Sequence, residues 1–140
     1  MALLEVEDLK VHYPVRGGLF RPKRFVRAVD GVSFRMEPGE TVGLVGESGC
    51  GKSTLGKALV RLEKPAAGRV LLNGLDMSTL RGRELRRARK NFQMIFQDPI
   101  ASLDPRMTVR EIISEGLVIQ GERDDKVITQ KVNEMLELVG

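Results

Sequence analysis

The segment from Gly46 to Ser53, GESGCGKS, constrains this chain more than any other part of its sequence. It satisfies the pattern G-x-x-x-x-G-K-[ST], in which glycines allow a tight loop whose backbone N–H groups point inward at phosphate oxygens. The apolar run at 41–45 before the loop predicts a strand covered on both faces, as in a parallel sheet. Apolar residues recur with helical spacing from Leu55 to Leu62 after it. Strand, glycine-rich loop and helix in this order predict a phosphate-binding P-loop fold.

Lys52 and Ser53 determine the chemistry expected of this loop. The ammonium of Lys52 would reach the β- and γ-phosphates of a nucleotide, and the Ser53 hydroxyl would bind a Mg2+ ion that bridges phosphate oxygens. The positive end of the following helix adds to the attraction for anions. We therefore predict that a nucleotide and Mg2+ contact Gly46, Ser48, Gly49, Cys50, Gly51, Lys52, Ser53 and Thr54.

The residues ahead of the loop have the pattern of an antiparallel sheet. A broken apolar alternation predicts one strand that ends near Tyr13. Asp30-Gly31 predicts a hairpin turn between strands at 26–29 and 32–36.

Strands and helices alternate in the rest of the chain. Further strands are expected at 69–72 and 91–96, with a basic helix over about 80–90 between them. Thr108 and Glu111 form the sequence pattern of a capping box, which predicts the start of a helix. A last helix is expected to carry the apolar residues from Ile128 to Val139.

Composition and charge exclude several classes of protein. The first ten residues carry acids where a secretory signal would carry basic residues and then an apolar block, so we expect a cytosolic chain. The single cysteine, Cys50, has no second thiol for a disulfide or a zinc site, and we expect it to contribute only its backbone N–H. His12, the only histidine, is expected to be a strand residue without a catalytic role. Basic clusters at 16–27 and 81–90 are typical of solvated faces, and the second lacks interleaved aromatic residues, so no nucleic-acid partner is expected.

Three elements in the right order resemble the ABC-type ATPases. The loop GESGCGKST at 46–54 resembles the ABC form of the phosphate loop, Gln97 resembles the Q-loop glutamine, and Tyr13 stands where that family places the aromatic residue that stacks on adenine. The resemblance implies an α/β P-loop NTPase fold of the ABC type, with an N-terminal antiparallel β-subdomain, an incomplete RecA-like core and the start of a helical subdomain. All 140 residues would then form the N-terminal part of one nucleotide-binding domain, divided into an antiparallel region at 1–40, a core from Walker A to Q-loop at 41–97 and the helical start at 98–140.

The resemblance also implies roles for single residues. Tyr13 would stack on the adenine of ATP, although a strand-end aromatic that covers core is the alternative. Gln97 would contact Mg2+ and the attacking water, whereas a surface residue at the end of a strand is the alternative. Asp98 follows an apolar run and resembles a Walker B aspartate, but Gln97 interrupts the run and Pro99 stands where the family has its catalytic glutamate, so we reject that role. The segment 98–108 would instead face a permease.

Longer stretches at 11–18, 26–34 and 96–109 look like the ATPase subunits of oligopeptide, dipeptide and nickel importers. This likeness implies ATP hydrolysis coupled to peptide import, with the subunit bound peripherally at the cytoplasmic face of the membrane. The implied partners are a second, non-identical ATPase subunit, two membrane permeases and, indirectly, an extracytoplasmic substrate-binding protein. Two alternatives stay open: the ATPase of another ABC system, for a different solute or for DNA repair, and a truncated nucleotide-binding module without hydrolysis.

Several elements of that family do not occur in these 140 residues. They are the signature L-S-G-G-Q, the Walker B strand, the general-base glutamate, the D-loop and the switch histidine. We therefore expect residues 1–140 alone to be inactive as an ATPase.

Overall fold

The computed structural model describes residues 2–15, 24–98 and 102–140. Most of the basic cluster at 16–27 lies outside the described residues, and so does Pro99. The chain divides into two compact units, Met1–Met94 and Ile95–Gly140, and each is described by itself. Within the described ranges no helix has the length and apolar character needed to cross a bilayer.

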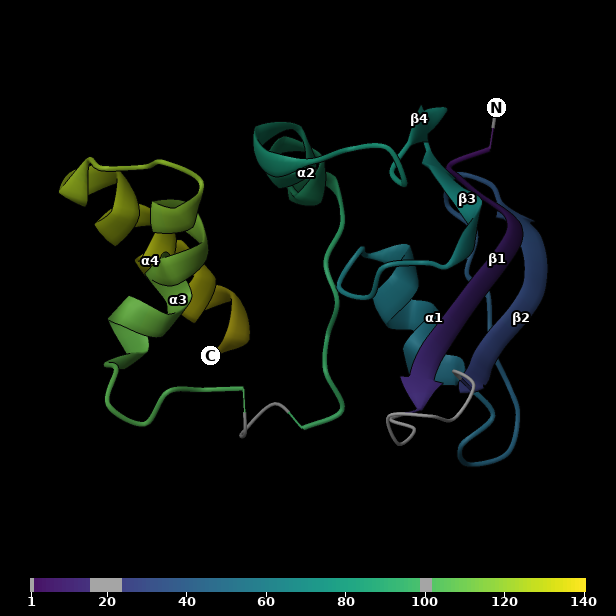
Figure 1. Ribbon diagram of the computed structural model, residues 1–140. Coiled ribbons are helices and arrows are strands. Elements are labelled where there is room, and N and C mark those ends of the chain that lie inside the picture. Colours follow the sequence, from purple (N-terminus) through teal and green to yellow (C-terminus); the bar gives the residue numbers. More distant parts are fainter. Residues whose placement is uncertain (1, 16–23, 99–101) are drawn as a thin grey trace. The chain divides into compact units, whose positions relative to one another are not determined.

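The first unit is built on a four-stranded antiparallel sheet (Figure 1). Its strands are β1 (Leu4–Val15), β2 (Arg24–Met36), β3 (Ala67–Leu72) and the short β4 (Leu75–Asp76), in the spatial order β2-β1-β3-β4. The antiparallel sheet expected ahead of the glycine-rich loop is therefore present, and the strand expected at 69–72 is β3.

A bulge in β1 explains why the apolar alternation of this strand is broken in the sequence. Val6 is buried at an even-numbered position, whereas Leu9 and Val11 are buried at odd-numbered ones. The phase changes around Asp8, whose backbone has a φ of 44°, and the pairing of β1 with both neighbouring strands shifts register there. Because one extra residue turns all following side chains to the opposite face, the bulge keeps all three apolar side chains in the core.

The hairpin predicted at Asp30-Gly31 is wrong, because β2 continues through both residues. Asp30 pairs with Lys10 and Val32 pairs with Leu9, so the two halves of β2 have the same partner strand. Gly31 is the extra residue between these pairs and has a φ of 81°. The Asp-Gly signal marks a bulge here, since the positive φ that glycine allows serves a bulge as well as a two-residue turn.

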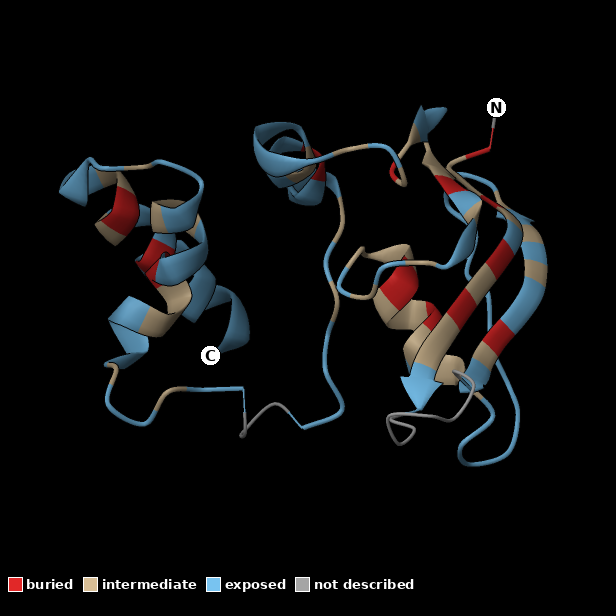
Figure 2. Cartoon of the chain, in the orientation of Figure 1, coloured by how far each residue is buried: buried red, intermediate tan, exposed pale blue. Residues whose placement is uncertain are grey.

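The core of the first unit joins the sheet to helices α1 (Lys52–Leu59) and α2 (Gly82–Ala88), the second of which leads into the 3-10 helix η1 (Arg89–Asn91). The buried positions of β1 and α1 stand out in Figure 2. The helices expected after the loop and over about 80–90 are thus both present. The buried cluster consists of Val6, Leu9, Val11, Val29, Leu55, Ala58, Val70, Met77 and Ala88.

The strands predicted at 41–45 and 91–96 do not form. Both segments lack regular strand structure, and Val45 and Ile95 are 92% and 93% exposed. None of the strands in the described parts of the chain pairs with either segment, so neither has the hydrogen-bonding partner that holds an extended backbone in a sheet. The parallel sheet that the apolar run predicted is therefore absent from residues 2–15, 24–98 and 102–140.

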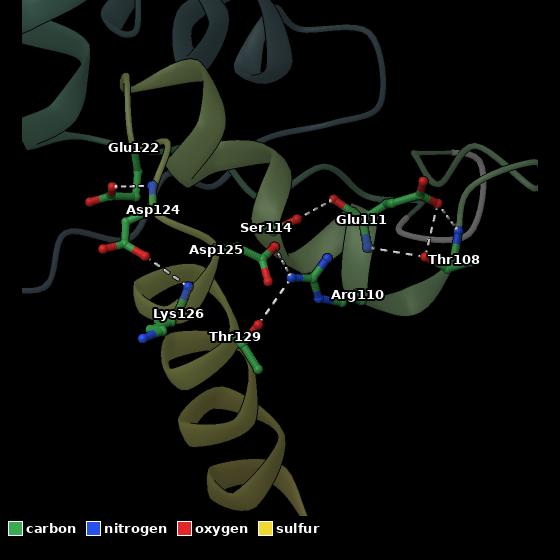
Figure 3. Close-up of polar contacts among 9 residues, drawn as sticks. All are labelled: Thr108, Arg110, Glu111, Ser114, Glu122, Asp124, Asp125, Lys126 and Thr129. Carbon is green, nitrogen blue, oxygen red and sulfur yellow. Dashed lines mark hydrogen bonds and ion pairs between the residues drawn. The ribbon is translucent and has the colours of Figure 1, made fainter.

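The second unit contains two helices, α3 (Val109–Ile119) and α4 (Asp125–Val139), which pack against each other. The Thr108 hydroxyl accepts a hydrogen bond from the Glu111 backbone N–H, and the Glu111 carboxylate accepts one from the Thr108 N–H at 2.7 Å (Figure 3). The predicted capping box is thus confirmed. The hydrogen bonds from the backbone and hydroxyl of Thr108 hold the pKa of Glu111 below its ordinary value.

Arg110 ties the start of α3 to α4. Its guanidinium donates to Asp125 Oδ1 at 2.6 Å and to Thr129 Oγ1 at 3.0 Å (Figure 3). Ile128 and Val132 of α4 are buried, as the sequence predicted, whereas Met135, Leu136 and Val139 of the predicted apolar stripe are 49%, 41% and 85% exposed. The two helices are therefore held by an apolar contact together with a polar bridge at one end.

Candidate phosphate-binding site

The glycine-rich loop leads directly into α1. Gly49 and Gly51 have φ angles of 82° and 97°, in a region that residues with a side chain rarely adopt. Gly51 is the N-cap of α1, and the helix begins at Lys52, directly after the loop. The first N–H groups of a helix have no partner within it and carry partial positive charge. The loop therefore ends at a point that stabilises an anion.

The ammonium of Lys52 lies within the loop. Lys52 Nζ donates to the carbonyl oxygens of Gly46 at 2.7 Å and Glu47 at 2.6 Å, and it lies 3.5 Å from Cys50 Sγ. Across the parts of the chain that the structure describes, no carboxylate forms an ion pair with this lysine. The first turn of α1 carries no acidic residue either. The positive charge is thus oriented by neutral carbonyl groups and left available to an anion.

The small size of Gly46 and the position of Cys50 are linked. A Cβ atom on Gly46 would lie 2.7 Å from Cys50 Sγ, which is closer than carbon and sulfur can approach. Cys50 is exposed, and its N–H donates to the Glu47 carbonyl at 3.3 Å. Among the other predicted contacts, Ser48 and Ser53 are exposed and Thr54 is half-buried in the first turn of α1.

The phosphate loop rests against strand β2, a contact that the sequence did not indicate. A Cβ atom on Gly51 would lie 2.2 Å from the carbonyl oxygen of Ala28 and 3.8 Å from Val29 Cγ2. Only a glycine allows this close approach of two backbones. The second glycine of the motif was a usable signal that some backbone lies close by, but nothing in the sequence identified β2 as the neighbour.

The contact between Gly51 and Ala28 predicts a loss of stability on substitution, and Gly49 provides a matched control. Gly51→Ala should lower the free energy of unfolding by clearly more than Gly49→Ala does. Both substitutions place alanine at positive φ, which costs about 1–3 kcal/mol. However, a Cβ atom on Gly49 meets nothing within 4 Å, whereas one on Gly51 collides with Ala28. Urea unfolding of both variants measures the difference, and equal losses of stability would show that the contact with β2 does not form.

Tyr13 and the phosphate loop meet the same stretch of β2. Tyr13 pairs with Val26, while Gly51 lies against Ala28 and Val29. The tyrosine is half-buried and packs partly against the core cluster. A part-exposed ring at this strand end is compatible with adenine stacking and with the simpler role of covering the core.

Gln97 is exposed and belongs to the second unit, so its contact with Mg2+ and water stays a prediction. No group of three or more His, Cys, Asp or Glu side chains gathers into a metal site among the described residues. A nucleotide-bound Mg2+ does not need such a group, because phosphate oxygens and water supply most of its ligands and the protein adds one or two oxygens. The exposed Ser53 hydroxyl suits that requirement.

Comparison with known proteins decides the family. The sequence model of the ABC transporter family matches residues 29–140, which include the phosphate loop and both helices of the second unit. The chain belongs to the ABC transporter family. Its structure resembles ABC cassettes over nearly the whole chain: the dimeric cassette MJ0796, bound to ADP and Pi, matches with a TM-score of 0.76 at 24% identity, covering 96% of this chain and 56% of that one. The antiparallel sheet and helices thus agree with the N-terminal part of an ABC ATPase fold.

Several curated relatives of this ABC family member are named as ATP-binding proteins of peptide transporters. It is 50% identical over 140 residues to the oligopeptide transport ATP-binding protein AppF of Bacillus subtilis, covering 99% of this chain and 43% of that protein. It is also 50% identical over 118 residues to the oligopeptide transport ATP-binding protein OppF of Salmonella typhimurium, covering 82% of this chain and 35% of that protein. The chain therefore spans about two fifths of the length of these relatives.

Proposed function

We propose that this chain binds ATP with Mg2+ through the loop from Gly46 to Thr54. The observation that carries the proposal is the Lys52 ammonium, which two loop carbonyls orient and no carboxylate of the described residues neutralises. Lys52 then contacts the β- and γ-phosphates, and the loop N–H groups bind the remaining phosphate oxygens. Ser53 and Gln97 would hold the Mg2+ ion, which offsets phosphate charge when bound.

The proposed task of the complete protein is to couple ATP binding and hydrolysis to import of peptides across the cytoplasmic membrane. Relatives named for oligopeptide transport, at 50% identity over most of the chain, support this assignment. In this proposal a second, non-identical ATPase subunit completes the nucleotide sites, and two permeases and an extracytoplasmic binding protein handle the solute. The subunit lies peripherally at the cytoplasmic face, and the chain forms the N-terminal antiparallel region (1–40), the core to the Q-loop (41–97) and the helical start (98–140) of its nucleotide-binding domain.

Uptake measurements test this function against its alternatives, which are nickel import, transport of another solute, DNA repair and nucleotide binding without hydrolysis. Deletion of the gene in its host should abolish uptake of a radiolabelled tetrapeptide, and a plasmid copy with intact Lys52 should restore it. A strain that imports the peptide normally but loses nickel uptake, or becomes sensitive to DNA damage, would assign the protein to another ABC system.

The proposed stacking of Tyr13 on adenine predicts a graded response to substitution. Tyr13→Phe should retain affinity for ATP, because the ring remains. Tyr13→Ala should weaken ATP and ADP equally, by about 1–3 kcal/mol or roughly 5- to 150-fold, because the lost contact is remote from the γ-phosphate. Titration calorimetry with both nucleotides measures this. Equal affinities of the wild type and both variants would mean that Tyr13 only covers the core.

A further inference from the structure

A hollow in the surface of the first unit, here called the β4–α2 hollow, lies where the chain passes from β4 to α2 (Figure 1). Its volume is about 360 Å³, which is within the range of sites that hold small molecules. The lining residues are Leu75, Leu80, Glu84, Arg87, Ala88 and Asn91. None of them belongs to the loop from Gly46 to Thr54, so the proposed nucleotide binding does not use this hollow.

The lining of the β4–α2 hollow is mostly apolar. Ala88 is buried in the core cluster, and Leu80 packs against that cluster. Leu75, on the two-residue strand β4, is 48% exposed. An apolar group placed in the hollow is removed from water together with part of the Leu75 side chain, and this burial is favourable. The hollow therefore suits a ligand that carries an apolar side chain.

Two opposite charges line the same hollow. Glu84 and Arg87 stand three positions apart on α2, a spacing that places two Cβ atoms about 5–6 Å apart on one face of a helix. Across the described parts of the chain, neither side chain forms an ion pair with the other or with a further residue. A hydrogen-bond acceptor and a hydrogen-bond donor of opposite charge are thus available to a ligand in the hollow.

The neighbouring cations favour an anion less than their number suggests. Arg83 and Arg86 are exposed on α2 and do not line the hollow, so salt screens their charges. Arg89 donates to the carbonyl oxygen of Arg61 at 2.9 Å. Glu84, in contrast, belongs to the lining itself and repels a ligand whose charges are all negative. A ligand with one charge of each sign suits both charged residues of the lining.

We propose that the β4–α2 hollow binds a short peptide that has free termini and an apolar side chain. Glu84 accepts hydrogen bonds from the peptide ammonium, and Arg87 donates to the peptide carboxylate. The apolar side chain lies against Leu75 and Leu80. Such a peptide belongs to the chemical class that the proposed import would deliver to the cytoplasm. The inference rests on the lining residues, however, and does not depend on the proposed function.

The spacing of the two charged residues favours a dipeptide over a free amino acid. The two Cα atoms of a dipeptide are about 3.8 Å apart, and its charged ends lie outside them, so they can reach Glu84 and Arg87 together. A free amino acid carries its ammonium and its carboxylate on one Cα atom. It therefore reaches only one of the two side chains at a time.

The experiment measures the Kd of L-leucyl-L-alanine for the full-length protein by ligand-detected NMR titration, with and without Mg-ATP. Glycylglycine has the same charged termini and no side chain, so it should bind roughly 5- to 10-fold more weakly. L-leucine should bind about 2- to 5-fold more weakly, because it loses one exposed charged contact. Equal affinities for L-leucine and the dipeptide would overturn the assignment to a peptide.

Two variants assign each end of the dipeptide to one residue. Glu84→Gln should weaken binding of the dipeptide about 2- to 5-fold, but it should not change the Kd of the N-acetylated dipeptide, which has no ammonium. Arg87→Gln should likewise weaken binding of the dipeptide and leave the Kd of its C-terminal amide unchanged. Arg83→Gln is the matched control, because it removes an arginine of the same helix that does not line the hollow. Its Kd values should equal those of the wild type.

Three results would overturn the inference. The first is that the full-length protein binds no dipeptide, as expected if another segment of the longer chain fills the hollow. The second is that inorganic pyrophosphate binds more tightly than the dipeptide and gains affinity on Glu84→Gln, which would assign the hollow to an anion. The third is that Arg83→Gln reproduces the effect of Arg87→Gln.

The nucleotide site is tested separately by Lys52→Ala, which should leave the Kd of the dipeptide unchanged. Failure of the wild type to bind ATP would contradict the proposed function alone, because the hollow shares no residue with the phosphate loop.

Discussion

Lys52→Ala is expected to abolish ATP hydrolysis by the full-length protein and to weaken ATP binding severely. The Lys52 ammonium lies inside the loop, where the Gly46 and Glu47 carbonyls orient it. A charge-assisted hydrogen bond contributes about 1.5–3 kcal/mol, so its loss should weaken ATP binding by roughly 10- to 150-fold. Turnover should fall to background, because charge on the transferred phosphoryl group is then poorly compensated.

Lys57→Ala is the matched control for this variant. It removes a lysine from the same helix, but from its last turn, where the cation only complements the helix dipole. Phosphate release and calorimetry should therefore be close to wild type for Lys57→Ala and lost or strongly reduced for Lys52→Ala. Near-normal turnover of Lys52→Ala would contradict the assignment of the loop as the catalytic phosphate site.

A polypeptide of residues 1–140 alone should release no measurable phosphate from Mg-ATP. Binding by the loop is not sufficient for hydrolysis, which also needs an aligned water, a carboxylate that receives its proton, and charge stabilisation on the far side of the γ-phosphate. Lys52 and Ser53 provide none of these three. Comparison of this polypeptide with one extended to the length of the curated relatives tests the expectation. Comparable phosphate release per chain, lost from the shorter polypeptide on Lys52→Ala, would show that these 140 residues contain a complete catalytic site.

The same polypeptide should also self-associate. Val42, Leu44 and Val45 are 46%, 54% and 92% exposed, and their backbone pairs with none of the described strands. Exposed apolar segments without strand partners favour association between chains. Size-exclusion chromatography with light scattering should show oligomers or aggregates for residues 1–140 and a defined species for the extended protein. A stable monomer of the short polypeptide would mean that these segments are covered in solution.

Local patterns in the sequence were sufficient for the elements that depend on neighbouring residues. The loop motif predicted that a helix follows it, and α1 begins at Lys52; Thr108 with Glu111 located the start of α3. A helix and its cap are stabilised by contacts within about four residues, so their signals are contained in a short window. The same loop motif, together with Tyr13 and Gln97, was enough to indicate the ABC family that the comparisons establish.

Strands were predicted less well, because their hydrogen bonds go to residues distant in the sequence. The apolar runs at 41–45 and 91–96 have the composition of buried strands, yet without a partner among the described strands they remain unpaired. Asp30-Gly31 has the composition of a turn, yet both flanking segments pair with β1, so the glycine forms a bulge. The residue types of a segment indicate that its backbone suits a sheet or a positive φ. Whether the segment becomes a strand, a turn or a bulge depends on which other strand is available to pair with it.

The sequence by itself determined that a phosphate-binding loop begins a helix, since glycines, a lysine and a hydroxyl at fixed spacing are sufficient for that chemistry. Only the tertiary structure decided what surrounds the loop. It placed Gly51 against Ala28, brought Tyr13 to the same stretch of β2, and joined His12 to Asp30 across the bulged pair. These contacts depend on the register between β1 and β2, and register is set by bulges that change which face each side chain occupies. A sequence pattern read in steps of two residues does not contain that information.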